Sequence, residues 1–249
     1  MGDYDQLLSL AKDAVQEAVT ALEKMAATNL LGYKFADDIP REIKADADCV
    51  LEKVILGYLK PTGIPILSEE TGDIRDTDNS ELRWIVDPLD GTVNFIRGLA
   101  PCAVSVALCH GNSPIFGVIG EYPSRRLAWG GRLIGAFIDG SSIHVSTIQG
   151  KSKAILCTGF PSRFDFNEAS APVFMELVSS FSKVRMLGAA SLSLLHVARG
   201  AADAYAEQDI MLWDVAAGLA LVEGAGGHIS TTPGRYRYSL NVFASNNAL

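Results

Sequence analysis

The chain has 249 residues, a formal net charge of -8 and a pI of about 5.0, and it is 48% hydrophobic and 20% charged. This balance is typical of a globular protein and excludes a disordered chain, and the length permits one large domain or two small ones. The negative surface argues against nucleic acid or anionic membranes as partners, and an anionic substrate would need a positive group other than a side chain, which indicates a metal.

The first part of the chain contains two amphipathic helices. Apolar residues recur with a helical period over residues 3–25 and again over 50–58. Residues 30–44 mix glycine, proline and charge without a period, which predicts a loop. Pro61 and Gly63 are expected to end the second helix.

Short apolar runs predict strands in the same part. Those at 64–67 and 84–86 are each followed by acidic residues. Three further runs, separated by turn residues, predict an antiparallel sheet at 103–109, 115–122 and 127–129. The first part is therefore expected to be α+β.

Beyond about residue 146 strands and helices alternate, which predicts an α/β arrangement. We expect strands at 154–158, 184–186 and 202–206, and helices at 169–181, 191–199 and 215–224. The run Gly224–Gly227 lacks the dinucleotide fingerprint and is interpreted as a helix stop. No low-complexity linker separates residues 1–146 from 147–249, so we expect two parts of one continuous unit.

Cysteine usage and hydropathy indicate a cytoplasmic protein. The four cysteines have no CxxC spacing and lie in apolar stretches, so we expect reduced thiols with structural roles: Cys49, Cys102, Cys109 and Cys157. No basic leader precedes an apolar core, and no apolar run approaches the about 20 residues of a membrane span.

The most informative acids occur in three groups next to apolar segments: Glu69-Glu70, the run Asp87–Thr92 (DPLDGT), and Asp214. Carboxylates that converge from strand ends and helix starts repel one another unless hard divalent cations neutralise them. Oxygen ligands of this kind suit magnesium. Within the run, Gly91 permits close backbone approach to an anion, and Thr92 stands where a helix N-terminus would favour phosphate.

Each group taken alone has an ordinary structural explanation. Asp-Pro-x-Asp-Gly is common turn chemistry, Asp214 resembles a helix N-cap, and paired glutamates are usually solvated. Together the three groups favour a metal site. The four histidines show no zinc spacing and no GxSxG motif is present, so nucleophilic hydrolase chemistry is not expected.

The segment 84–95 (WIVDPLDGTVNF) closely resembles the first signature of the inositol monophosphatase family, and 212–218 (LWDVAAG) resembles the second. Shorter landmarks of the family follow the expected order, at 68–70, 135–137, 159–161, 188–190 and 203–207. The resemblance covers the chain from Ala45 to its last residue. It implies a layered αβαβα sugar-phosphatase fold, a homodimer, lithium sensitivity, and hydrolysis of a small phosphorylated metabolite with two or three magnesium ions.

The resemblance also implies roles for individual residues. Glu69, Asp87 and the Leu89 carbonyl would hold one metal, and Asp87, Asp90 and Asp214 a second. Glu69 and Thr92 would orient the attacking water, with Asp48 supporting Thr92 and Asp90 acting in catalysis. Gly91 and Thr92 would donate backbone N–H groups to phosphate. The alcohol would contact Gly188, Ala189, Ala190, Glu207 and Asp214.

Two segments depart from the family pattern: 41–47, where a mobile flap and a third metal would lie, and Gln208-Asp209, beside the expected hydroxyl contacts. Substrate alternatives are fructose 1,6-bisphosphate, histidinol phosphate, amino-sugar phosphates and 3′-phosphoadenosine nucleotides. The run from Thr92 to Phe95 favours the inositol type over the nucleotide type. A non-catalytic regulator would be expected to lose metal ligands, and none is lost here.

Overall fold

The computed structural model describes residues 2–28, 33–35, 43–74, 81–160, 164, 166 and 170–249. The elements up to residue 142 are α1 (Gly2–Thr28), β1 (Tyr33–Phe35), β2 (Ile43–Ala45), α2 (Asp46–Leu59), β3 (Ile66–Ser68), β4 (Gly72–Ile74), β5 (Leu82–Asp90), α3 (Thr92–Arg97), β6 (Cys102–His110), β7 (Ser113–Tyr122), β8 (Leu127–Gly131), β9 (Gly135–Ile138) and β10 (Ser141–Ser142). Those that follow are β11 (Ile155–Thr158), α4 (Ser170–Ser179), β12 (Lys183–Arg185), α5 (Ala190–Ala198), β13 (Ala204–Met211), α6 (Leu212–Gly224), β14 (His228–Pro233) and β15 (Ser239–Ser245).

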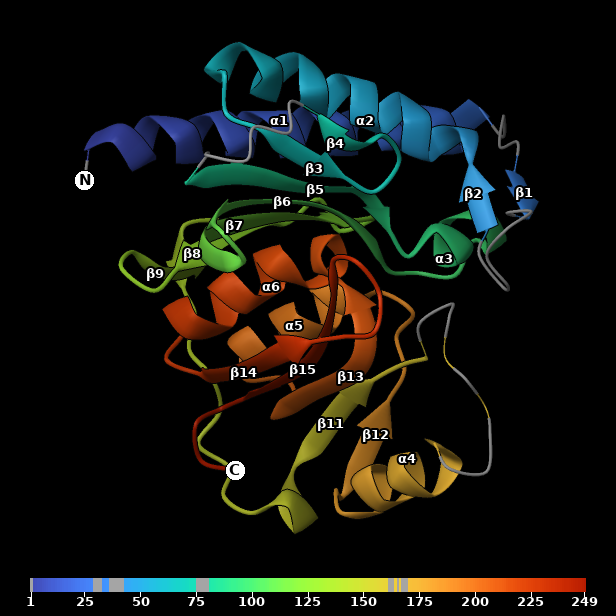
Figure 1. Cartoon of the computed structure of the whole chain (residues 1–249), viewed down its shortest axis with the longest axis vertical. Coiled ribbons are helices and arrows are strands. Elements are labelled where there is room, and N and C mark those ends of the chain that lie inside the picture. The colour runs from blue at the N-terminus through green and yellow to red at the C-terminus, as the bar shows by residue number, and fades with distance from the viewer. Residues whose placement is uncertain are drawn as a thin grey trace.

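These elements stack in five layers (Figure 1). Helices α1 and α2 cover one face of an eight-stranded sheet of order β10-β9-β8-β7-β6-β5-β3-β4. Helices α5 and α6 lie between this sheet and a five-stranded sheet of order β12-β11-β13-β15-β14, and α4 lies beyond the second sheet. The layered αβαβα fold is confirmed.

Glycines in β7 let helices approach the large sheet closely from both faces. A Cβ added to Gly117 would come within 2.4 Å of the Ala217 backbone in α6. One added to Gly120 would come within 2.7 Å of Val15 and Val19 in α1. Since interiors are close-packed, larger residues at these positions would push the layers apart. The absence of a side chain at these two glycines thus permits the close packing of α6 and α1 on the sheet.

The helices and strands that we expected are present, with some differences in length. Strand β5 extends to Asp90, so Asp87 and Asp90 lie within the end of the strand and not after it. An irregularity in its pairing with β6 between these two residues accommodates Pro88, which cannot donate a ladder hydrogen bond. The expected helix stop is confirmed, since α6 ends at Gly224.

Seven strands were not predicted: β1, β2, β4, β9, β10, β14 and β15. The loop expected at 30–44 is wrong in its described part, where β1 and β2 pair antiparallel. Most of these seven strands are short or, as in β14, carry mainly exposed polar residues, so they lack an apolar period. In β15 the buried residues Leu240, Val242 and Ala244 alternate with less buried ones, which is a strand signal in the sequence. Because β14 and β15 pair antiparallel, the second sheet is mixed and not wholly parallel.

None of the four cysteines, all of them in the described part of the chain, forms a disulfide, but Cys49 is exposed and does not pack as a small hydrophobe. Most of the expected loop 30–44, and residues 41–42 of the expected flap, lie outside the described residues, as does Pro161 of one landmark. The expected division at residue 146 falls between β10 and β11 and stays a prediction. None of the helices in the described part combines the length and apolarity needed to cross a membrane.

Candidate metal centre

Three segments that are distant in the sequence bring carboxylates to one end of the large sheet. Strands β3 and β5 are parallel neighbours, and the Glu69 N–H donates to the Val86 carbonyl at 3.1 Å, so Glu69 lies beside Asp87. Strand β13 leads directly into α6, where Asp214 is the third residue. Its carboxylate accepts the Met211 N–H at 3.2 Å, which fixes it at the helix start.

The resulting acidic cluster consists of Glu69, Asp87 and Asp214. One carboxylate oxygen from each lies within 4.8 Å of the others. These separations suit simultaneous contact with a small cation, because magnesium-oxygen distances are about 2.1 Å. The structure therefore brings three of the predicted ligands together.

Burial and mutual repulsion dominate the electrostatics of the cluster. Burial, followed by the charges of Glu69, Asp90 and Asp214, raises the pKa of Asp87 well above its ordinary value. Burial and the neighbouring carboxylates also raise the pKa of Asp214 well above its ordinary value. The charged forms are thus unfavourable without a compensating positive charge.

The surroundings of one Asp87 oxygen show whether the site suits a cation. Asp87 is 1% exposed, and its Oδ2 atom has no hydrogen-bond partner among the described residues. A buried carboxylate oxygen without a donor is costly, and a cation is a natural partner for it. The donor set is made of carboxylates, which suits a hard divalent ion. The acidic cluster can therefore hold a metal ion.

Asp90 adjoins the cluster but has a second role. It is buried, and its carboxylate accepts N–H groups from Ala190 at 3.1 Å and from Ser191 at 2.7 Å, together with the Ser191 hydroxyl. Burial raises the pKa of Asp90 to about 6, against the lowering effect of these hydrogen bonds. Asp90 thus caps α5 and lies outside the three-carboxylate group, so its metal ligation stays a prediction.

The side chains of Thr92 and Asp48 lie within hydrogen-bond distance, as the family resemblance implied. The Thr92 Oγ1 atom lies 3.1 Å from Asp48 Oδ1 and 2.9 Å from the Leu89 carbonyl oxygen. The other Asp48 oxygen accepts the Ala45 N–H at 2.7 Å, and Asp48 is buried. The Thr92 hydroxyl is therefore held between an acid and a carbonyl, both of them predicted site groups.

The predicted backbone contacts for phosphate and alcohol lie side by side. Gly91 has a φ of 88°, and a Cβ there would lie 3.3 Å from both Ala189 Cβ and the Gly188 carbonyl. Asn94 Nδ2 donates to the Leu187 carbonyl at 2.8 Å and so ties α3 to this loop. Asn94 was not singled out as a site residue, although it lies within the first signature.

Glu207 lies at the other side of the site, beside the end of β11. A Cβ at Gly159 would come within 2.6 Å of Glu207 Oε1, so the carboxyl packs against bare backbone. Burial raises the pKa of Glu207 to about 8, with an opposing effect of the Tyr205 hydroxyl and a smaller rise from Asp90. Tyr205 was not anticipated, because its place beside the site depends on how the layers pack.

Gln208-Asp209 departs from the family pattern, and the structure explains the role of Asp209. Asp209 is buried, and its carboxylate accepts the Arg235 N–H at 2.6 Å and the Arg235 Nε–H at 2.7 Å. It therefore anchors the turn between β14 and β15. Gln208 is exposed and lines a cavity on the outer side of the sheet.

A family model described as the inositol monophosphatase family matches residues 3–248. The chain belongs to this family. A chloroplastic phosphatase, IMPL1 of Arabidopsis thaliana, is 35% identical over 202 residues, which cover 78% of this chain and 54% of the relative. This match thus spans about half of the relative's length.

Two other comparisons cover more of the matched proteins. An inositol-1-monophosphatase of Rhizobium meliloti is 35% identical over 192 residues, which cover 76% of this chain and 71% of the relative. The crystal structure of the extragenic suppressor protein suhB from Bartonella henselae matches with a TM-score of 0.85 and 29% identity, and covers 98% of this chain and 95% of that one. The inositol monophosphatase architecture is therefore present throughout the described chain.

Proposed function

We propose that this chain is a magnesium-dependent phosphatase that hydrolyses a phosphate monoester of a small metabolite, with Glu69, Asp87 and Asp214 as metal ligands. The acidic cluster is the observation that supports this most, because three separate segments place carboxylate oxygens within 4.8 Å of one another. In addition, the buried Asp87 Oδ2 has no hydrogen-bond partner in the part of the chain that the structure describes. Membership of a phosphatase family supports the reaction class.

Two or three ions are expected. The Leu89 carbonyl would join Glu69 and Asp87 at one ion, and Asp90 would join Asp87 and Asp214 at another. Divalent cations, when bound, supply Lewis acidity that makes a water molecule more acidic and neutralises charge on the phosphoryl group. Positioning and charge neutralisation would then supply most of the catalysis.

The chain's own groups would orient the reactants. Glu69 and the Thr92 hydroxyl would hold the attacking water, and a proton accepted at Thr92 Oγ1 can pass to Asp48 Oδ1, 3.1 Å away. The N–H groups of Gly91 and Thr92 would bind phosphate, because the first N–H groups of a helix lack intrahelical partners.

The alcohol part of the substrate would be held on the opposite side. The backbone of Gly188–Ala190 and the carboxyl of Glu207 are the proposed partners of its hydroxyl groups, with Asp214 close to the leaving oxygen. Because burial raises the pKa of Glu207 to about 8, this carboxyl is mostly protonated near pH 7 and can donate a hydrogen bond as well as accept one.

Phosphate release by the purified protein tests the proposal. We expect turnover of at least one ester among inositol, hexose, fructose bisphosphate, amino-sugar, histidinol and adenosine phosphates with magnesium, and none in EDTA. Asp87→Asn should lower kcat about 100-fold or more. It should leave the metal-free unfolding temperature unchanged or higher, because it removes a repelled carboxylate.

Asp13→Asn is the matched control, since Asp13 is exposed on α1. Asp87→Asn tests the ligand role more cleanly than Asp90→Asn, because Asp90 also caps α5. Full magnesium-dependent turnover by Asp87→Asn would contradict the assignment. Lithium inhibition, a homodimer and a cytoplasmic location are further expectations, which inhibition assays, light scattering and cell fractionation can check.

A further inference from the structure

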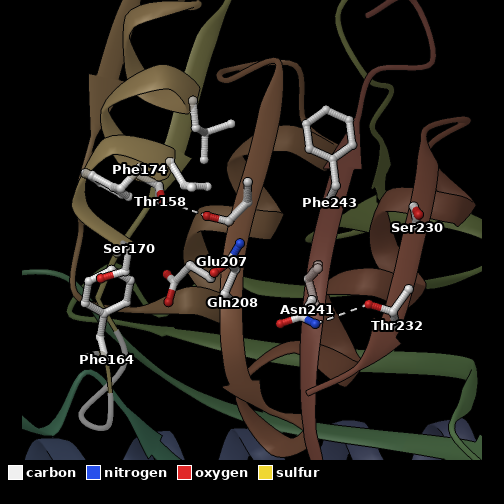
Figure 2. Close-up of a pocket in the computed structure, with 15 residues that line it drawn as sticks. Thr158, Phe164, Ser170, Phe174, Glu207, Gln208, Ser230, Thr232, Asn241 and Phe243 are labelled. Carbon is white, nitrogen blue, oxygen red and sulfur yellow. Dashed lines mark hydrogen bonds between the residues drawn. The ribbon is translucent and has the colours of Figure 1, made fainter. Parts of the chain in front are cut away.

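A cavity of about 350 Å³, here named the α4 cavity, lies between α4 and the outer face of the five-stranded sheet (Figure 2). Strands β11, β13, β14 and β15 form its floor, and α4 forms its wall. An apolar cavity of about 150 Å³ already accommodates benzene. The α4 cavity therefore has room for a substantial organic group, within the size range of ligand pockets.

Helix α4 presents one face to this cavity but buries none of its residues. The lining residues have the spacing of a single helical face: Ser170, Val173, Phe174 and Leu177. Val173 remains 54% exposed although it points to the cavity side. Burying apolar surface of this kind is favourable by about 25 cal/mol per Å², so a ligand that fills the cavity would gain from it.

The lining exposes mainly apolar surface, and polar side chains from several elements stand around it. Rings from Phe164, Phe174 and Phe243 border the space, and Figure 2 shows the Glu207 carboxyl directed toward the side of Ser170 and Phe164. Aromatic walls favour a flat ring, which can adopt edge or offset contacts with them. This lining fits an uncharged aromatic group better than a bare polyol.

Glu207 connects the α4 cavity to the acidic cluster. Glu207 is one of the residues that line the cavity, and its carboxyl interacts electrostatically with Asp90 and Asp214. Gly159, also in the lining, lies directly against this carboxyl, since a Cβ there would come within 2.6 Å of Glu207 Oε1. Glu207, a proposed partner of the alcohol's hydroxyl groups, is therefore also a wall residue of the α4 cavity.

We propose that the α4 cavity binds an uncharged aromatic group carried by the alcohol part of the substrate, so that this chain prefers phosphate esters of aromatic alcohols. This inference rests on the phosphatase function proposed above and names its substrate class. Residues Val173 and Phe174 would then determine specificity without touching the phosphate.

A matched pair of esters tests the preference. Phosphate release with magnesium should give 3-phenylpropyl phosphate a kcat/KM roughly 10-fold or more above that of propyl phosphate, as expected for burying a phenyl group. Val173→Trp should abolish this advantage by filling the cavity and leave propyl phosphate unchanged. Met175→Trp, on the same helix, 60% exposed and outside the lining, should behave as wild type.

Binding of 3-phenylpropanol in EDTA, measured by saturation-transfer NMR, separates the two proposals. Binding to wild type and to Val173→Ala but not to Val173→Trp supports the cavity inference even if no ester is hydrolysed, in which case the phosphatase proposal fails. Hydrolysis of both esters with equal kcat/KM, or equal losses for both in Val173→Trp, overturns the cavity inference and leaves the phosphatase proposal standing. Circular dichroism checks the fold of each variant.

Discussion

Asp87 is the residue whose buried carboxylate is hardest to explain without a bound cation. It is almost fully buried, Glu69 and Asp214 face it, and its Oδ2 atom lacks a donor among the described residues. Isolated buried charges of this kind either pair or take up a proton. Asp90 shows the contrasting solution, because the start of α5 supplies its hydrogen bonds.

The proposed role of the Thr92 hydroxyl can be tested by substitution. Thr92→Val keeps the shape of the side chain but removes the hydroxyl that lies between Asp48 and the Leu89 carbonyl. We expect kcat to fall about 100-fold or more at saturating magnesium, since general acid-base groups contribute about that much. Thr92→Ser restores the hydroxyl and should keep most of the activity. Equal activity of the Val and Ser variants would contradict a role of the hydroxyl in proton transfer.

Among the elements, the turn between β14 and β15 joins the two segments that carry Glu69 and Asp214. The Tyr238 carbonyl accepts the Leu212 N–H at 2.9 Å, at the start of α6. The Tyr238 hydroxyl donates to Asp73 in β4, which also accepts Arg237 at 3.0 Å. Since β4 follows the turn that contains Glu69, Tyr238 links this hairpin to the helix that carries Asp214.

Removing this link should loosen the acidic cluster. Tyr238→Phe is expected to raise the magnesium concentration for half-maximal activity several-fold, since outer groups that orient ligands contribute about 10-fold or more to metal affinity. The kcat at saturating magnesium should stay near wild type. Tyr58→Phe, in α2, is the control. An unchanged magnesium requirement would show that the linkage does not position the cluster.

Elements with a clear apolar pattern were predictable: α1 from its helical period, which indicates the buried face, and β6 from an apolar run whose residues are buried on both faces. Strand β14 was not, since its side chains are polar and largely exposed and it forms because β15 offers a pairing edge. The length of β5 was underestimated because Pro88 is usually a strand breaker, and only its irregular pairing with β6 accommodates it.

For the whole molecule, the raised pKa values predict how stability depends on pH. Burial raises the pKa of Asp90 from 3.8 to about 6 and that of Glu207 from 4.5 to about 8. Between the ordinary and the raised values, the folded state holds protons that the unfolded chain has lost. Stability of the metal-free protein should therefore fall as pH rises from about 4 to 8.

Calorimetry in EDTA should show that the unfolding temperature falls as the pH rises from about 4 to 8. Magnesium should raise the unfolding temperature most near pH 8, because metal binding requires deprotonated carboxylates and stabilises only the folded state. Glu207→Gln should flatten the decline between about pH 6 and 8. A metal-free unfolding temperature that rises over this window would contradict the predicted direction.

The sequence by itself determined the amphipathic helices, about half of the strands and the types of the ligand residues, because these depend on local apolar patterns and on side-chain chemistry. Only the tertiary structure decided that Glu69, Asp87 and Asp214 meet, that Asp90 caps α5 and that Asp209 holds Arg235. It also decided that α4 leaves a cavity beside Glu207. Such contacts arise from the packing of layers whose residues are far apart in the chain, and local sequence patterns do not indicate which distant residues come together.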